Sequence, residues 1–278
     1  MRLWAAAVFA LLLACAAHAG EFQGRPVEIT DGRTQDRPAP LVVVLHGFTG
    51  SGAAMQRKTR FDALARRDGF VVAYPNARAR RWNDRGQGRP DDVAYLGGLI
   101  DALINEGRAD PARIYLAGHS NGGAMALRMA CTQPRRLAGI AVVAMNALAE
   151  APCHGAAPLP AIFIHGSVDP VVPARGLPDA GILSVKETLA IWAARNGCQP
   201  VPVREIINSS TARRVATFTR YTTCRAALVQ MVIAGQGHEW PGAGVRARWI
   251  QGPASSAVDA AALSWWFFGT TAPVKSRP

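Results

Sequence analysis

The pentapeptide Gly-His-Ser-Asn-Gly at residues 118–122 constrains this chain more than any other feature, because of the segments on either side of it. The apolar, β-rich run Arg113–Ala117 precedes it, and the helix-forming run Ala124–Ala130 follows it. A serine at such a strand-to-helix turn is typical of a nucleophile elbow, in which flanking glycines avoid collisions with the neighbouring strand and helix. The helix N-terminus favours negative charge beside that serine. We therefore expect Ser120 to be a nucleophile; a purely structural turn is the alternative.

The rest of the chain alternates between strand and helix patterns. Uninterrupted apolar runs at Leu41–Leu45 and Phe70–Tyr74 are typical of strands buried on both faces of a parallel sheet. Further strands are expected at 26–29 (an edge strand), 137–144, 161–164, 217–221 and 227–233, and helices at 93–107, 184–196 (with a Ser184–Glu187 capping box) and 255–268. This alternation predicts an α/β fold with a doubly wound, mostly parallel sheet and helices on both faces. Its ligand site should lie at the carboxyl ends of the strands.

The beginning of the chain has the pattern of an export signal. A basic start and an apolar run over residues 3–17 lead to Ala17-His18-Ala19, which matches a small-x-small cleavage site. The apolar run is too short for a membrane span. We therefore expect residues 1–19 to be a cleaved signal peptide, and residues 20–278 to form one catalytic domain of a secreted or periplasmic protein. Leu12–Cys15 resembles a lipoprotein signal, so lipidation of Cys15 is the minor alternative.

Cleavage of the signal would remove Cys15 and leave four cysteines, namely Cys131, Cys153, Cys198 and Cys224. An even number in an exported protein indicates two disulfides, with three possible connectivities. Neighbours in sequence are the favoured partners, because Cys131 with Cys153 and Cys198 with Cys224 would each close a loop of about two dozen residues. No Cys-x-x-Cys pair or cysteine–histidine cluster has zinc-ligand spacing, so we expect no metal site.

The net charge of +12 comes from 31 basic residues, nearly all of them arginines. A GC-rich coding sequence produces such a bias without any functional cause. One segment stands apart, because Arg78, Arg80, Arg81, Arg85 and Arg89 crowd the loop 78–89. No basic-aromatic nucleic-acid motif accompanies them, so we expect no nucleic-acid partner. If this loop faces Ser120, it would favour an acidic or polyanionic substrate.

A serine hydroxyl needs a base that takes its proton and a third group that orients the base. On a fold of this kind, the order along the chain is serine, acid, histidine. His238 lies in a glycine-rich loop after the last expected strand and is the expected base; a surface-loop histidine is the alternative. Asp169, in the loop that leaves the strand 161–164, is the expected acid, with Asp179 as the fallback. A turn-forming Asp-Pro is the structural alternative for Asp169.

Two backbone N–H groups are expected to stabilise the oxyanion of the reaction. One is the N–H of Asn121, the residue after the nucleophile. The other should come from the turn at residues 46–50, which follows the strand 41–45. Phe48 is the first choice for this donor and Thr49 the alternative, while a plain glycine turn is the structural reading. His46 is expected to make structural hydrogen bonds rather than to catalyse.

Five motifs occur in order along the chain: His46-Gly47-Phe48, Asp91-Asp92-Val93, Gly118–Gly123, His165-Gly166-x-x-Asp169 and Gly237-His238-x-Trp240-Pro241-Gly242. Together they resemble the secreted polyhydroxybutyrate depolymerase-like esterases of the α/β-hydrolase superfamily, a group that includes feruloyl esterases of carbohydrate esterase family one. The likeness covers nearly the whole mature chain. It departs from the pattern at Phe48, where members often carry cysteine, and the sequence shows no appended carbohydrate- or polymer-binding module.

The resemblance implies that Ser120, Asp169 and His238 form the triad and that both disulfide pairings exist. It also implies that Trp82 and Trp240 border the substrate cleft. Stacking of these two rings on an aromatic acyl group is one hypothesis, and packing at the rim is the equal alternative. Thr49 is a further candidate for substrate contact.

The expected function is that of a cofactor-independent serine hydrolase that cleaves small, oligomeric or polymeric carboxylic esters through an acyl-enzyme. The sequence leaves hydroxyalkanoate, feruloyl and acetyl esters open. One alternative is a related hydrolase of a polyanionic substrate such as poly(aspartic acid). Another is a non-catalytic binding protein on the same scaffold, although such proteins usually lack part of the triad and this chain keeps every candidate.

Overall fold

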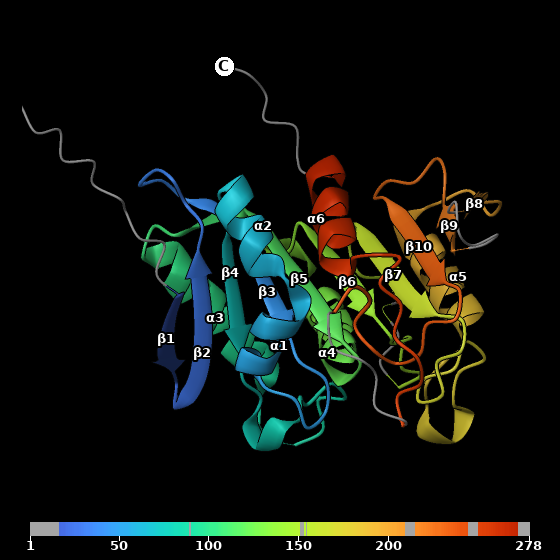
Figure 1. The fold of residues 1–278 in the computed structure, drawn as a ribbon, viewed down its shortest axis with the longest axis horizontal. Helices are drawn as coiled ribbons and strands as arrows, with labels where there is room; N and C mark the ends of the chain where they lie inside the picture. Colours follow the sequence, from blue (N-terminus) through green and yellow to red (C-terminus); the bar gives the residue numbers. More distant parts are fainter. Residues whose placement is uncertain are drawn as a thin grey trace, which may run out of the picture.

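The structure is a computed structural model that describes residues 17–88, 90–150, 153, 155–208, 215–243 and 250–271. These residues form one ten-stranded sheet with the strand order β1-β2-β4-β3-β5-β6-β7-β10-β9-β8 (Figure 1). The strands are β1 Ala17–Phe22, β2 Arg25–Asp31, β3 Ala39–Leu45, β4 Val71–Pro75, β5 Ala109–His119, β6 Gly139–Val143, β7 Ala161–Gly166, β8 Val203–Ile207, β9 Ala216–Arg220 and β10 Leu228–Ile233.

The centre of the sheet is parallel and its two edges are antiparallel. Strands β4, β3, β5, β6, β7 and β10 run parallel, while β1–β2 and β8–β9 pair antiparallel at opposite edges. Every residue of β4, β6 and β7 is buried, as expected for strands covered on both faces. This arrangement confirms the predicted fold class. The prediction that residues 26–29 form an edge strand is wrong, because β2 pairs with β1 on one side and with β4 on the other.

Helices cover both faces of the sheet (Figure 1). Residues of α1 Gly52–Thr59, α2 Phe61–Asp68 and α6 Ala260–Thr271 pack into the core on one face. Residues of α3 Asp92–Asn105, α4 Asn121–Thr132 and α5 Val185–Asn196 pack into the core on the other. The capping box at the start of α5 is present as predicted, with both the Ser184 and the Glu187 hydrogen bonds formed. The connections also contain short 3-10 turns η1 Arg78–Arg80, η2 Pro134–Arg136 and η3 Pro178–Ala180.

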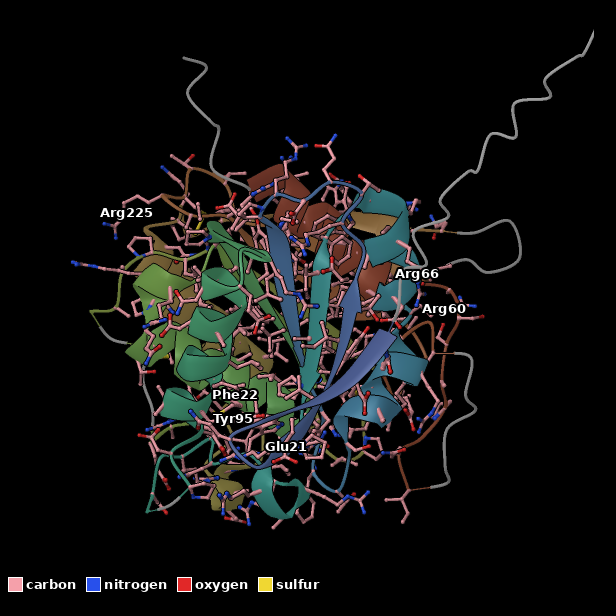
Figure 2. The ribbon with its side chains drawn as sticks, turned by 90° about the vertical axis from the view of Figure 1, so that its left-hand side faces the viewer. Glu21, Phe22, Arg60, Arg66, Tyr95 and Arg225 are labelled. Carbon is pink, nitrogen blue, oxygen red and sulfur yellow. A yellow bond between two sulfur atoms is a disulfide. The ribbon has the colours of Figure 1, made fainter. Side chains whose placement is uncertain are left out.

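The β1–β2 edge packs against α3 (Figure 2). The ring of Phe22 lies 5.8 Å from the ring of Tyr95, and the Arg25 guanidinium lies 3.9 Å from the Tyr95 centroid. Strand β1 begins at Ala17 and so crosses the cleavage point expected after Ala19. Residues 1–16, including Cys15, lie outside the described residues. Within the described ranges, no helix has both the length and the apolar character needed to cross a membrane.

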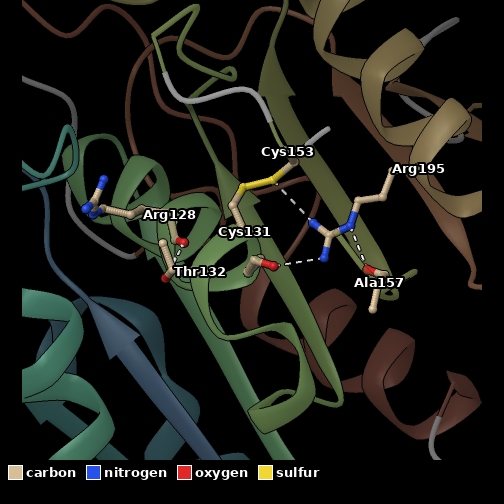
Figure 3. Close-up of a disulfide and its surroundings, with 7 residues drawn as sticks. Arg128, Cys131, Thr132, Cys153, Ala157 and Arg195 are labelled. Carbon is tan, nitrogen blue, oxygen red and sulfur yellow. Dashed lines mark hydrogen bonds between the residues drawn. A yellow bond between two sulfur atoms is a disulfide. The ribbon is translucent and has the colours of Figure 1, made fainter. Parts of the chain in front are cut away.

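Both predicted disulfide pairings are present. Cys131 at the end of α4 is joined to Cys153, and Cys198 after α5 is joined to Cys224 before β10. Around the first disulfide, Arg195 donates to the backbone oxygens of Ala157 and Ala130 at 2.9 and 2.8 Å and to the Cys153 sulfur at 3.4 Å (Figure 3). The guanidinium therefore ties α5 to the end of α4 and to the segment that follows β6.

Candidate active site

The strand-to-helix turn at Ser120 has the geometry of a nucleophile elbow. Ser120 stands between β5 and α4 with φ 53° and ψ −123°, a conformation that residues other than glycine rarely adopt. A Cβ on Gly118 would lie 2.2 Å from the Gly122 oxygen, and a Cβ on Gly122 would lie 2.4 Å from the Leu45 oxygen. The flanking glycines are therefore required by close backbone contacts, as the sequence predicted.

Ser120, His238 and Asp169 form one hydrogen-bonded row at the carboxyl ends of three strands. The Ser120 Oγ lies 2.8 Å from His238 Nε2, and His238 Nδ1 lies 2.8 Å from Asp169 Oδ2. The three residues follow β5, β10 and β7 in the chain, and His238 and Asp169 are buried. The fallback acid Asp179 is exposed in η3 and is not part of this row.

Backbone donors fix the orientation of the Asp169 carboxylate. Its Oδ1 accepts the N–H groups of Val171 and Val172 at 2.9 and 2.8 Å, which leaves Oδ2 for the imidazole. With Nδ1–H donating to Asp169, the Nε2 atom of His238 can accept the Ser120 proton. The row can therefore carry a proton away from the serine hydroxyl.

The loop that carries His238 is fixed at several points. The His238 N–H donates to the Gln251 oxygen at 2.6 Å, and His119 Nε2–H donates to the His238 oxygen at 3.0 Å. Burial, the neighbouring His238 and the Lys58 ammonium hold the pKa of His119 well below its usual value, so His119 is a neutral donor. Beside it, the buried Glu239 carboxylate forms an ion pair with Lys58 of α1.

The other two histidines near the strand ends are also structural. His46 Nδ1–H donates to the Gly47 oxygen at 2.8 Å and its Nε2 accepts the Ala77 N–H at 3.1 Å, a pattern that requires the neutral ring. His165 Nε2–H donates to the Val172 oxygen at 2.7 Å. Burial lowers the pKa of both rings. Their roles agree with the expectation that His46 is a hydrogen-bonding residue.

The hydrogen bonds of the turn after β3 distinguish the two candidates for the second oxyanion donor, Phe48 and Thr49. The Thr49 N–H donates to the Arg80 oxygen at 2.9 Å and is therefore already used. The Phe48 N–H forms no backbone hydrogen bond within the described part of the chain. On the other side, the Asn121 N–H belongs to the first turn of α4, where N–H groups have no partner within the helix. The N–H groups of Phe48 and Asn121 are therefore both without a backbone acceptor in the described part of the chain, whereas the Thr49 N–H has one.

The two tryptophans expected to border the substrate cleft are buried. Trp82 and Trp240 are 0% and 1% exposed, so neither indole can stack on a bound acyl group in this conformation. Trp82 lies beside the His46 ring at 5.2 Å, and Trp240 packs edge-on against Phe61 at 6.2 Å. Stacking on a substrate is therefore wrong for this conformation, and the alternative of packing describes both rings. Thr49, in contrast, is exposed.

The exposed apolar side chains near the row were not foreseen. Phe48 is 61% exposed, and Val168 and Val171, which flank Asp169 and Pro170, are 50% and 37% exposed. Exposed apolar residues carry information where several share one region. Phe48 stands on the turn after β3, and Val168 and Val171 stand on the loop that carries Asp169.

The first part of the arginine-rich loop lies against the oxyanion turn. Arg80 donates to the backbone oxygens of Gly50, at 3.1 Å, and Thr49, while the Arg81 guanidinium lies 5.9 Å from the centre of the Phe48 ring. Arg85 instead pairs with Glu150 at 3.0 Å and points toward η3, where it donates to the Ala180 oxygen. Arg89 lies outside the described residues. No group of three or more metal-ligating side chains is found within the described ranges.

Comparisons with known proteins show the family of the chain. The family model described as Esterase PHB depolymerase matches residues 27–172, more than half of the chain. A putative esterase, NocK, of Nocardia uniformis subsp. tsuyamanensis is 31% identical over 229 residues, which cover 73% of this chain and 66% of that protein. Feruloyl esterase B of Piromyces equi is 27% identical over 63% of this chain and 36% of its own length. The matches thus span less than two thirds of either relative.

A solved structure supports the fold. The acetyl xylan esterase from Aspergillus awamori superposes with a TM-score of 0.59 at 18% identity, over 78% of this chain and 89% of that chain. With the parallel sheet, the serine turn and the family match together, the chain belongs to the esterase PHB depolymerase family of carboxylic ester hydrolases and has the α/β-hydrolase fold.

Proposed function

We propose that this protein is a serine hydrolase of carboxylic esters, with one catalytic domain over residues 20–278, that reacts through an acyl-Ser120 intermediate. The observation that carries the proposal is the unbroken row from Asp169 through His238 to Ser120, with both hydrogen bonds at 2.8 Å. The remaining groups that ester hydrolysis needs are backbone donors for the oxyanion. We propose those of Asn121, which follows the serine in the chain, and of Phe48, which follows Gly47, where an added Cβ would lie 3.3 Å from the Ser120 Cβ.

The reaction uses each of these groups in turn. His238 Nε2 takes the Ser120 proton while Oγ attacks the ester carbonyl, and the Phe48 and Asn121 N–H groups stabilise the oxyanion that forms. The imidazolium, stabilised by Asp169, then gives its proton to the departing alcohol. Water enters, loses a proton to His238 and attacks the acyl carbon; as the acyl–Oγ bond breaks, His238 returns that proton to Ser120 Oγ and the acid leaves. The proton balance closes within the protein, and the steps need no cofactor.

The test is hydrolysis of short p-nitrophenyl esters together with labelling by a fluorophosphonate. We expect Ser120→Ala to abolish both turnover and labelling, and His238→Ala and Asp169→Asn to reduce turnover by about 10⁴-fold or more. Full activity of Ser120→Ala would refute the nucleophile. Labelling of the unmodified protein at Ser120 would exclude the non-catalytic binding alternative.

For the substrate, we propose an ester with an extended apolar portion, of the hydroxyalkanoate or aromatic acyl type. The support is the exposed apolar side chains of Phe48, on the turn after β3, and of Val168 and Val171, on the loop that carries Asp169. The names of the relatives are also those of esterases, one of them a feruloyl esterase. A panel of short alkyl esters, methyl ferulate and hydroxybutyrate oligomers tests this. Turnover restricted to acetyl esters would contradict it.

A second candidate is an ester or polymer substrate that carries negative charge, including poly(aspartic acid). It is favoured by the Arg81 guanidinium beside the Phe48 ring, on the same turn as a proposed oxyanion donor. Arg81→Gln should raise KM for monomethyl succinate, an anionic ester, and leave KM for methyl butyrate unchanged. Arg135→Gln, on an exposed residue of η2, is the matched control. Equal KM changes for the two esters, or no dependence on salt, would refute this candidate.

We also propose that the protein is exported, with cleavage after Ala19 and with no nucleic-acid partner. The two disulfides support an oxidising compartment. N-terminal sequencing of the mature protein should begin at Gly20. A lipid-modified Cys15 would support the alternative instead. Cleavage at Ala19 would leave Gly20–Phe22 of strand β1 paired with β2.

A further inference from the structure

Trp82 is bonded to both sides of the proposed oxyanion hole. Its indole Nε1–H donates at 2.9 Å to the backbone oxygen of His46, which begins the turn that carries Phe48. Its backbone N–H donates to Asn121 Oδ1 at 2.8 Å, and its backbone oxygen accepts Asn121 Nδ2–H at 3.1 Å. The Trp82 side chain is 0% exposed, so water cannot reach its ring. One residue therefore connects the two chain segments that supply the donors.

The segment after Trp82 is anchored by Asp92, a member of the Asp91-Asp92 motif that ester hydrolysis itself does not use. Asp92 Oδ2 accepts the Asn83 N–H at 2.7 Å, and Oδ1 accepts Arg25 Nη1–H at 2.6 Å. The Asp92 side chain is 0% exposed and that of Arg25 only 7% exposed. Asn83 Nδ2 also donates to the Pro90 oxygen at 2.8 Å, which closes the loop. Both carboxylate oxygens are satisfied, as a buried charge requires.

We propose that Trp82 is a positioning residue that sets the distance between the Phe48 and Asn121 N–H groups, and that Asp92 holds it in place. The proposal rests on the proposed function, because this distance matters only if an oxyanion forms between the two donors. An oxyanion hole is effective when its donors are preorganised for the charge of the transition state. Loosening them therefore affects the transition state more than the bound substrate.

The first test is Trp82→Phe, which removes the Nε1–H donor and keeps an aromatic ring in the interior. The matched control is Trp192→Phe, because Trp192 is also buried, at 1% exposed, but packs edge-on against Phe163 under α5. Three quantities are measured: kcat, KM for p-nitrophenyl acetate, and the inhibition constant of a trifluoromethyl ketone, whose adduct with serine carries an oxyanion.

We expect Trp82→Phe to lower kcat about tenfold, a part of the 10²–10³ that one donor is worth. KM should stay within about twofold, and the trifluoromethyl ketone should bind about tenfold more weakly, in proportion to kcat. Trp192→Phe should leave all three quantities within about twofold of the unmodified protein. A lowered Tm alone would not produce this split between kcat and KM.

A second pair of variants tests the positioning role if Trp82→Phe does not fold. Asn196 makes the same two hydrogen bonds to one backbone unit, Leu159, at 3.1 and 2.9 Å, and is 0% exposed. Asn121→Ala should lower kcat and weaken binding of the trifluoromethyl ketone, whereas Asn196→Ala should lower only Tm. Unchanged kcat in both site variants, or equal losses in the controls, would overturn the positioning role. An active Ser120→Ala would overturn the proposed function instead.

Discussion

Gly122, in the first turn of α4, is the position where one added methyl group has the most calculable effect. A Cβ at this residue would lie 2.4 Å from the Leu45 oxygen and 2.5 Å from the His46 oxygen. A carbon–oxygen contact needs about 3.3 Å or more, so Gly122→Ala must separate the start of α4 from the end of β3 by about 0.9 Å. Both obstacles are backbone atoms, so no side-chain rotation can relieve them.

The separation would move the Asn121 donor away from the Phe48 donor. A misplacement of about 1 Å corresponds to about a 100-fold loss of rate, and overpacking of an interior costs about 1–3 kcal/mol. We expect both effects for Gly122→Ala, measured as kcat/KM for p-nitrophenyl acetate and as the free energy of unfolding. Gly269→Ala in α6 is the control, because nothing lies within 4 Å of the added Cβ. The Gly269→Ala variant should have a free energy of unfolding about 0.5–1 kcal/mol higher than wild type and should keep full activity. A kcat/KM within threefold of wild type for Gly122→Ala would refute the reasoning.

Three further predictions concern stability. Burial lowers the pKa of three histidines, His46, His119 and His165, below the usual 6.5. On acidification the unfolded chain therefore binds protons that the folded chain does not. The stability that the three histidines contribute is present above pH 6.5 and is lost below it, by up to about 1.4 kcal/mol per pH unit and histidine; a Tm that rises from pH 7 to pH 5 would contradict this. Replacing Cys131 and Cys153 by serine should cost about 2–4 kcal/mol in denaturant unfolding, and an unchanged midpoint would argue against the disulfide. Glu239→Gln should lower Tm more than Glu150→Gln, because Glu239 is buried beside Lys58 whereas Glu150 is an exposed partner of Arg85; equal shifts would contradict the difference.

Much of the fold was predictable because the central strands have a strong local signal. The apolar run 41–45 and the strand that leads into Ser120 have the pattern of buried parallel strands, and the structure shows both, the second ending at His119. The order of Ser120, Asp169 and His238 along the chain could also be read, because loops after parallel strands meet at one edge of the sheet. Their hydrogen bonds follow from that topology.

The elements that escaped prediction have weak local signals. Helices α1 and α2 have eight residues each and are separated only by Arg60, which adopts φ 64°. Two turns of helix give little periodicity to recognise. Strand β8 is exposed at every position, and its sequence Val-Arg-Glu-Ile-Ile does not alternate between apolar and polar residues. Its place is set by pairing with β9, a contact that no local pattern reveals.

The position of an indole is equally hard to read from a motif. Trp240 belongs to the motif at residues 237–242 and Trp82 lies in the arginine-rich loop, and a tryptophan in either place suits a substrate cleft or the interior. Their burial depends on the packing of α2 and of the turn after β3, which are distant in sequence. The choice between Phe48 and Thr49 likewise depends on one long-range bond, from the Thr49 N–H to the Arg80 oxygen.

The backbone of Ser120, with φ 53° and ψ −123°, has a consequence for how a family of this kind changes over time. Glycine adopts this conformation freely, whereas for any other residue the conformation costs about 1–3 kcal/mol of stability. Ser120→Gly should therefore melt at a higher temperature than the active protein while it hydrolyses nothing. Under the proposed function, backbone stability favours glycine at this position and hydrolysis requires serine. In a lineage released from that demand, the hydroxyl should be among the first groups to disappear, so its retention in a descendant is a record of continued selection for chemistry.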